Sequence, residues 1–180
     1  MDTLPPADRT LPAWLIAELR SDHAGETGAV RIYDGVLAVS RDPSVRAFAA
    51  RHRQTEAGHL DLLNGVLPKA QHSRLLPIWR VAGFLTGALP ALFGPRAVFA
   101  TIDAVETFVD HHYRQQIERL DAEAILPGIR AMLERCREDE VEHRDEARAA
   151  ETAPPGMLLT LWCRVVATGS EKAVVAARRI

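Results

Sequence analysis

Residues 22–33 read DHAGETGAVRIY and place a glutamate on the helical face that should be buried. Apolar residues recur every three or four positions through this stretch, which is the period of an amphipathic α-helix. The resulting stripe comprises Leu15, Leu19, Asp22, Glu26, Ala29, Tyr33 and Val36. Because an unpaired carboxylate is costly to bury, Glu26 requires a partner in the core.

Three further segments repeat this pattern, with ionisable residues near the middle of an apolar stripe. Their ionisable residues are His52, Glu56 and His59 in residues 43–65, Glu106 in residues 95–121, and Glu140 and His143 in residues 124–150. Burying so many charges without partners would cost several kcal/mol each, and together would exceed the ~5–15 kcal/mol stability of a domain. The sequence therefore predicts that these groups neutralise bound metal ions.

The order of these residues supports a metal centre more strongly than any single motif. The spacing Glu-x-x-His occurs twice, at residues 56–59 and 140–143, and places both side chains on one helical face. A lone glutamate precedes each pair, and this order is how a four-helix bundle assembles a di-iron or di-manganese site. The predicted metal ligands are Glu26, Glu56, His59, Glu106, Glu140 and His143.

Residues around the predicted ligands suggest how the site is supported. Tyr33 and Tyr113 each follow a lone glutamate by seven residues, so each lies two turns along the same stripe. Asp139 is the first candidate to accept the free ring N–H of a ligand histidine, and Asp22 is the second. Carboxylates with one imidazole per ion suit iron or manganese better than structural zinc.

A metal-free bundle is the alternative interpretation of the same residues. In that case the four glutamates would be solvated helix positions and His59 and His143 would be core histidines with satisfied hydrogen bonds. Independent surface positions have no reason to keep the alternating order, so we favour the metal site. His23, His52 and His72 are expected not to bind metal. Of the three, His52 is the strongest candidate for an exception, because it precedes Glu56 by one helical turn.

Composition sets wider limits on the chain. It has 180 residues, 47% hydrophobic and 26% charged, and a net charge of −2, which predicts one globular domain over residues 1–180 and provides no overall attraction to nucleic acid. Cys136 and Cys163 show no CxxC spacing, so we expect reduced thiols. Residues 1–12 lack the basic and apolar segments of a secretory signal, so we expect no export.

Prolines and glycines divide the chain into six helical stretches, and strand patterns are almost absent, so the fold class is all-α. The expected helices span residues 12–39, 43–65, 74–89, 95–121, 124–150 and 155–178. The most apolar stretch, Val81 to Phe93, is shorter than the ~20 residues that span a bilayer. It is either a buried core helix or a segment that lies in a membrane surface.

Four segments carry a family resemblance: DHAGETGAVRIYDG, QTEAGHL, AVETFVDHHYRQQI and EDEVEHRDEA. They resemble the signature segments of the demethoxyubiquinone hydroxylases, ferritin-like di-iron monooxygenases of ubiquinone biosynthesis. The resemblance runs from about residue 19 to residue 146 and continues weakly through CRVVATGSEKA. It implies a ferritin-like four-helix bundle with two additional helices. It also implies that the six predicted ligands bind two iron ions.

The resemblance also implies the reaction. A hydroxyl group is placed on the ring of a polyprenylated methoxy-methyl-benzoquinol with one atom of O2, while two external electrons reduce the other atom to water. His112 and Tyr113 match a family position near which electron transfer is suspected, and they are candidate catalytic residues. The resemblance further implies a lipid-presenting helper protein. A second copy of the chain is a candidate partner that the resemblance does not decide.

A polyprenyl quinol is confined to the bilayer, so its hydroxylase must reach the membrane surface. Residues 79–93 and the last predicted helix combine apolar, aromatic and basic residues, which is typical of interfacial helices. We therefore expect a peripheral protein on the cytoplasmic face of the cell membrane. The alternative function is that of a ferritin-like or rubrerythrin-like protein that oxidises iron or removes peroxide.

Overall fold

The computed structural model describes residues 11–151 and 154–180. Most of the N-terminal segment in which no secretory signal is expected, residues 1–12, therefore lies outside the described residues. Within these ranges the chain is all-helical, with six α-helices, one short 3-10 helix and no strand. The elements are α1 (Ala13–Val39), α2 (Pro43–Val66), η1 (Lys69–Gln71), α3 (Leu76–Ala91), α4 (Pro95–Glu123), α5 (Pro127–Ala149) and α6 (Met157–Ala177). The predicted all-α class is confirmed, and each predicted helix is present with its ends shifted by a few residues.

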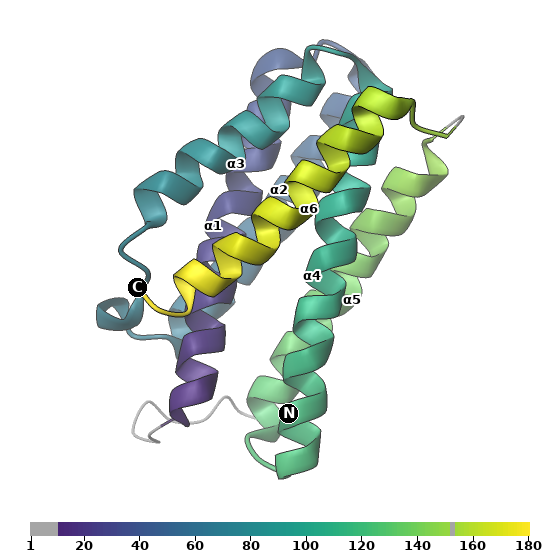
Figure 1. The fold of residues 1–180 in the computed structure, drawn as a ribbon. Coiled ribbons are helices and arrows are strands. Elements are labelled where there is room, and N and C mark those ends of the chain that lie inside the picture. The colour runs from purple at the N-terminus through teal and green to yellow at the C-terminus, as the bar shows by residue number, and fades with distance from the viewer. Residues whose placement is uncertain (1–10, 152–153) are drawn as a thin grey trace.

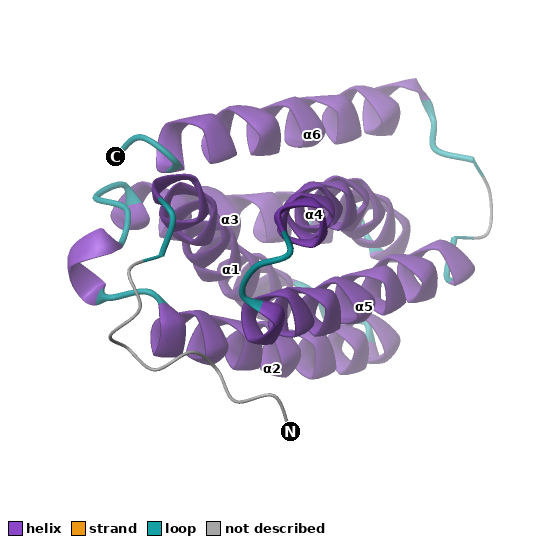
Figure 2. Ribbon diagram, turned by 90° about the horizontal axis from the view of Figure 1, so that it is seen from below, coloured by secondary structure: helices purple, strands orange, loops and turns teal. Residues whose placement is uncertain are grey.

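The helices form a bundle in which α1 packs on α2 and α4 packs on α5 (Figure 1). Helix α3 packs along α1, and α6 crosses over α4 and α1 (Figure 2). The four elements that carry the predicted ligands, α1, α2, α4 and α5, therefore surround a common interior. Helices α3 and α6 cover that interior from outside.

The core consists of two hydrophobic clusters with a polar layer between them. Along α1, Leu19 belongs to one cluster and Tyr33 to the other, with Glu26 between them. Along α4, Ile102 and Tyr113 belong to different clusters and flank Glu106 in the same way. Apolar packing on both sides thus holds the helices that present the polar layer.

Helix ends follow local chemistry, partly as expected. The Asp42 side chain accepts hydrogen bonds from the backbone N–H groups of Ser44 and Val45, which caps the start of α2. Helix α3 continues through Pro90 to Ala91, beyond the predicted end at residue 89. Gly94, which precedes α4, has a φ of 93°, a conformation that favours glycine.

Glycines bring α3 unusually close to α1. A β-carbon at Gly87 would overlap the carbonyl oxygen of Ile32, and one at Gly83 would overlap that of Gly28. On α1, a β-carbon at Gly35 would overlap the carbonyl oxygen of Phe84. The two backbones are therefore in direct contact, and no side chain larger than hydrogen fits between them.

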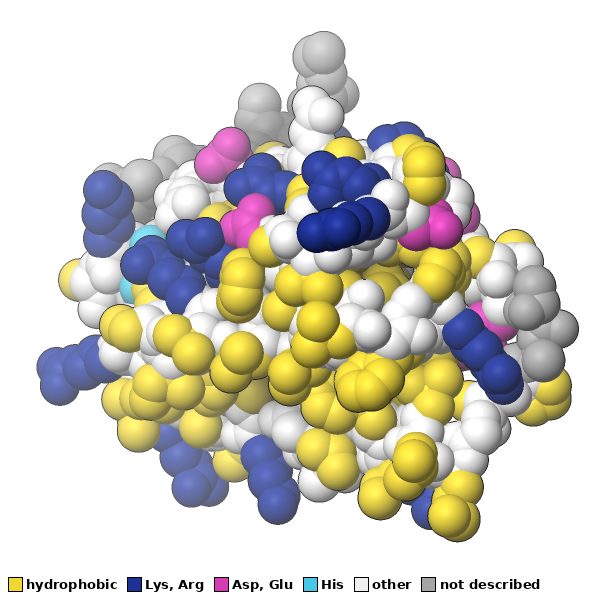
Figure 3. Space-filling model, turned by 90° about the horizontal axis from the view of Figure 1, so that it is seen from above, with side chains coloured by type: hydrophobic (Ala, Val, Ile, Leu, Met, Phe, Trp, Pro, Cys, Tyr) yellow, Lys and Arg dark blue, Asp and Glu magenta, His cyan; other side chains and the backbone are white. Residues whose placement is uncertain are grey.

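The opposite face of α3 is exposed, so this segment is not the core helix that was one of the two alternatives. Exposed hydrophobic residues of this segment include Val81, Leu85, Leu89, Leu92 and Phe93. Helix α6 adds Met157, Leu158, Leu161 and Val165. We call these nine residues the apolar face; Figure 3 shows hydrophobic side chains gathered broadly on this side, with basic side chains around them. In the described part of the chain, no helix has both the length and the hydropathy needed to cross a membrane.

Candidate metal centre

All six predicted ligand side chains are buried and lie close together in the polar layer. They form two overlapping groups in which the candidate ligand atoms lie within 4.8 Å of one another. One group comprises Glu26, Glu56, His59 and Glu140, and the other comprises Glu56, Glu106, Glu140 and His143. Glu56 and Glu140 belong to both groups, a sharing that the sequence did not predict.

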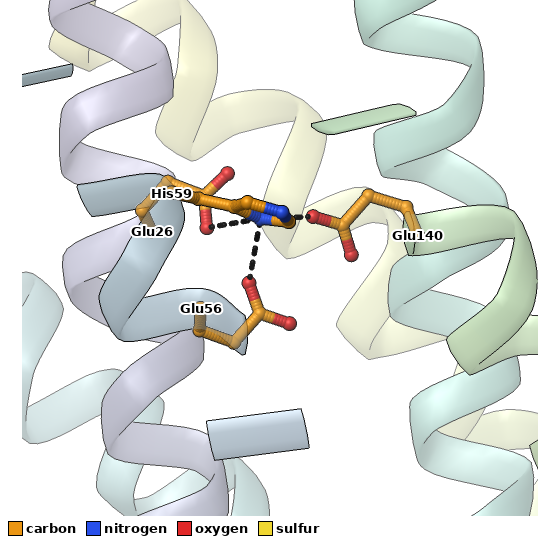
Figure 4. Close-up of side chains that lie close together, drawn as sticks. All are labelled: Glu26, Glu56, His59 and Glu140. Atoms are coloured by element: carbon orange, nitrogen blue, oxygen red, sulfur yellow. Dashed lines mark ion pairs between the residues drawn. The ribbon is translucent and has the colours of Figure 1, made fainter. Parts of the chain in front are cut away.

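In the first group, one ring nitrogen of His59 faces three carboxylates (Figure 4). His59 Nδ1 lies 3.1 Å from an oxygen of Glu140, 3.5 Å from one of Glu56 and 3.7 Å from one of Glu26. These groups come from α1, α2 and α5, so the cluster depends on the packing of three helices.

The second group repeats this geometry around His143. Its Nδ1 lies 3.1 Å from Glu56 Oε1 and 3.3 Å from Glu140 Oε2. Each half of the chain thus supplies one histidine, and each histidine faces a carboxylate from the other half.

The hydrogen bonding of the polar layer fits a bound cation. Among the described residues, both carboxylate oxygens of Glu56 and of Glu140 are buried without a hydrogen-bond donor. Glu26 Oε2 and the Nδ1 atoms of His59 and His143 also have no hydrogen-bond partner there. Buried polar groups are normally satisfied, so this set of oxygen and nitrogen lone pairs matches the donor set of two hard metal ions.

Burial and mutual repulsion shift the pKa values of these groups strongly. Burial, together with the charge of Glu56, raises the pKa of Glu26. Burial and the charge of Glu140 raise the pKa of Glu106. Burial alone would lower the pKa of His143, but the adjacent carboxylates of Glu140 and Glu56 raise it to about 11. Carboxylates in this layer therefore attract positive charge, which metal ions would supply.

The two tyrosines connect the halves of the site. Tyr33, on α1, donates a hydrogen bond to Glu106 Oε1 at 3.2 Å. Tyr113, on α4, donates a hydrogen bond to Glu26 Oε1. Each tyrosine therefore contacts the lone glutamate of the other half rather than its own, and each fixes the orientation of a carboxylate.

Contacts behind the histidines include one that was expected and one that was not. His59 Nε2 lies 2.9 Å from Asp139 Oδ2, which is the contact predicted from sequence. Asp22, the second candidate, instead accepts a hydrogen bond from His112, which is not among the predicted ligands. His52 lies outside both groups, bonds to Glu146 at 2.8 Å, and packs edge-on against the ring of His143.

A cavity of about 360 Å³ connects the polar layer with α3 and α6. Four of the predicted ligands, Glu26, Glu56, Glu106 and Glu140, lie along it. The other lining residues are mostly apolar and come from α1, α3, α4 and α6, including Trp79 and Trp162. The candidate catalytic residues His112 and Tyr113 also line this cavity.

Comparison with known proteins points to one family. Residues 13–177 match the family model described as "Ubiquinone biosynthesis protein COQ7". The chain is 36% identical over 180 residues to the 3-demethoxyubiquinol 3-hydroxylase of Rhodospirillum rubrum, covering 97% of this chain and 82% of the relative. It is 36% identical over 168 residues to the mitochondrial NADPH-dependent 3-demethoxyubiquinone 3-hydroxylase of Rattus norvegicus, covering 89% and 76%.

Proposed function

Because the chain belongs to the COQ7 family of ubiquinone biosynthesis proteins, we propose that it hydroxylates the ring of a polyprenylated demethoxyubiquinol with O2. The six clustered residues Glu26, Glu56, His59, Glu106, Glu140 and His143 would hold two iron ions. Their helical setting on α1, α2, α4 and α5 corresponds to a ferritin-like four-helix bundle, and the whole chain acts as one domain.

One observation carries this proposal: a single mostly apolar cavity reaches from the predicted ligands to α3 and α6. An iron-storage or peroxide-removing protein would need access for ions or small polar molecules. A passage lined by Trp79, Trp162 and Val165 instead suits a large apolar substrate. The cavity therefore favours the hydroxylase over the ferritin-like or rubrerythrin-like alternative.

Bound iron would supply the activation of O2, which protein side chains cannot provide. The side chains have complementary tasks. Glu56 and Glu140, shared by both groups, would hold the two ions close together. Tyr33 and Tyr113 keep Glu106 and Glu26 oriented, and the apolar cavity wall keeps water from the reacting ring.

His112 is suited to orient the quinol. It lines the cavity, and its Nε2–H donates to Asp22 Oδ1 at 2.9 Å. Gln116 Nε2 donates to the same Asp22 oxygen at 2.8 Å, which fixes the carboxylate. With Nε2 held in this way, the other ring nitrogen is left to accept a hydrogen bond from a hydroxyl group of the ring.

The apolar face supports peripheral attachment to the cytoplasmic side of the cell membrane. Phe93 is 82% exposed and Met157 is 84% exposed, and Arg96 and Arg164 lie close to them in the sequence. Side chains of this kind insert into the boundary between headgroups and acyl chains. Attachment there would let the polyprenyl tail pass between α3 and α6. A lipid-presenting helper protein and a second copy of the chain remain proposed partners.

The test is iron content per chain after anaerobic loading, followed by O2 uptake with a short-tail demethoxyubiquinol. Two irons per chain and a hydroxylated product detected by mass spectrometry are expected. The exchange Glu26→Ala should damage the site, whereas Glu142→Ala, at an exposed position of α5, should change neither measurement. Two irons with O2 uptake but no hydroxylated product would favour the iron-handling alternative, and no bound metal would contradict both functions.

A further inference from the structure

A second cavity, of about 370 Å³, lies between α1, α2, η1 and α3 and shares no lining residue with the first. Its polar lining includes four cationic side chains, Arg31, Arg53, Lys69 and Arg80. We call it the basic pocket, and we propose that it binds a phosphate group. This site is independent of the proposed hydroxylation.

The charges of the basic pocket are not balanced by the protein. Asp34 is the one carboxylate that lines it, and it accepts hydrogen bonds from Arg31 at 2.9 Å and from Arg53 at 2.5 Å. Within residues 11–151 and 154–180, Lys69 and Arg80 form no ion pair. Four cations and one carboxylate leave an excess of three positive charges, in a chain whose net charge is −2.

Two histidines distinguish the basic pocket from an ordinary solvated patch of arginines. The rings of His23 and His72 stack at 3.8 Å, and only 4% of His23 is exposed. His23 Nε2 bonds to Asn64 at 3.3 Å, while its Nδ1 is buried with no partner among the described residues. Burial and the charges of His72 and Arg80 lower the pKa of His23 to about 4, as expected in an electropositive site.

A phosphate group matches this chemistry best. Its double negative charge offsets most of the excess, and its oxygens accept the several N–H donors that arginine and lysine present. The volume also leaves room for a group attached to the phosphate. Arg80 directly precedes Val81, an exposed residue of the apolar face, so one cation of the pocket lies next to that face along α3. A dissolved phosphate compound and the headgroup of a lipid both have access to that position.

Calorimetric titration with inorganic phosphate tests the first source, and binding to phosphatidylcholine vesicles with and without phosphatidic acid tests the second. The full chain is compared with the double variant Lys69→Gln/Arg80→Gln. The control is Arg41→Gln/Arg135→Gln, which removes the same charge at exposed positions outside the pocket. Because the pocket variant removes two charged hydrogen-bond donors, we expect it to bind at least about tenfold more weakly.

Saturable phosphate binding that the pocket variant loses and the control keeps would support the site with a dissolved ligand. A preference for phosphatidic acid that the pocket variant alone loses would support it with a lipid headgroup. Resonances of the His23 and His72 rings should shift on binding, and those of the exposed His111 should not. Equal binding by wild type and pocket variant, equal loss in the control, or no saturable binding of either probe would overturn the proposal.

Discussion

The polar layer and the apolar face depart from ordinary globular architecture in opposite directions. The layer buries four carboxylates and two imidazoles, none more than 4% exposed. The face leaves Phe93 and Met157 more than 80% exposed. Each arrangement is unfavourable in water without a partner, and one cavity joins them. Such departures from ordinary packing are typical of functional sites, and both regions are therefore the first places to look for bound partners.

The largest expected effect is that of Glu56→Ala, which tests whether the polar layer exists to hold metal. Because Glu56 belongs to both groups, we expect iron to fall from two per chain to nearly none. Hydroxylation should fall by more than about 100-fold, beyond the 10–100-fold loss typical of residues behind the ligands. Glu26→Ala, which affects one group, should retain about one iron. Iron quantification and product formation measure both, and two retained irons in Glu56→Ala would contradict the shared role.

The apolar face is tested next by Phe93→Ser/Leu161→Ser. Full burial of such side chains stabilises by about 1.5–3 kcal/mol each, so partial insertion of two should account for about 100-fold in vesicle affinity. Iron content should not change, because neither residue lies along the cavity. Co-sedimentation with vesicles provides the measurement. If affinity is unaffected, the face serves another purpose, such as contact with a protein.

A smaller effect is expected from Asp139→Asn. This exchange keeps all six predicted ligands and changes only the group that faces the Nε2 atom of His59. Loss of the carboxylate beside His59 Nε2 should weaken iron binding by about tenfold, the lower end of the usual range, since Asp139 is 46% exposed. Competition with a chelator measures this change. Glu138→Gln, at the adjacent exposed position, should bind iron like wild type.

The smallest effect concerns the pH dependence of stability and tests His23, a buried histidine outside the polar layer. The pKa of His23 is lowered to about 4 in the folded chain, so the unfolded chain binds a proton more readily below pH ~6.5. Stability contributed by neutral His23 is therefore complete above pH ~6.5 and declines as pH falls towards 4. Urea unfolding of the metal-free protein measures this loss. As the pH falls over this range, the free energy of unfolding should decrease by about 1 kcal/mol less in His23→Gln than in wild type, after allowance for solvent screening. Parallel pH profiles would refute this role.

Much of the fold and the clustering of the candidate metal ligands could be predicted, because both depend on helical periodicity. Once Glu26, Glu56, Glu106 and Glu140 fall on the apolar stripes of four helices, packing those stripes together brings them into contact. The sequence could not show which glutamates belong to both groups, because that depends on how far each helix is displaced along its axis relative to its neighbours. It also could not show that Tyr33 contacts Glu106, because Tyr33 lies in the first half of the chain and Glu106 in the second.

Other features depend on which helices become neighbours. The apolar period of α3 is compatible with burial or exposure, and only the close approach through Gly83 and Gly87 decides which face packs on α1. The contact between Asp22 and His112 joins residues 90 positions apart, and no local pattern indicates it. The basic pocket likewise collects residues from three helices and η1, so its charges look scattered in the sequence.

The glycine contact between α1 and α3 has a consequence for how the cavity can change its width. Since the two backbones touch without intervening side chains, α3 cannot approach α1 further, and sliding past it would bring carbonyl groups into collision. The wall that α3 provides is therefore set at a fixed spacing from the helix that carries Glu26. Helix α6 has no such contact with α1, so any change in the width of the cavity falls mainly to α6.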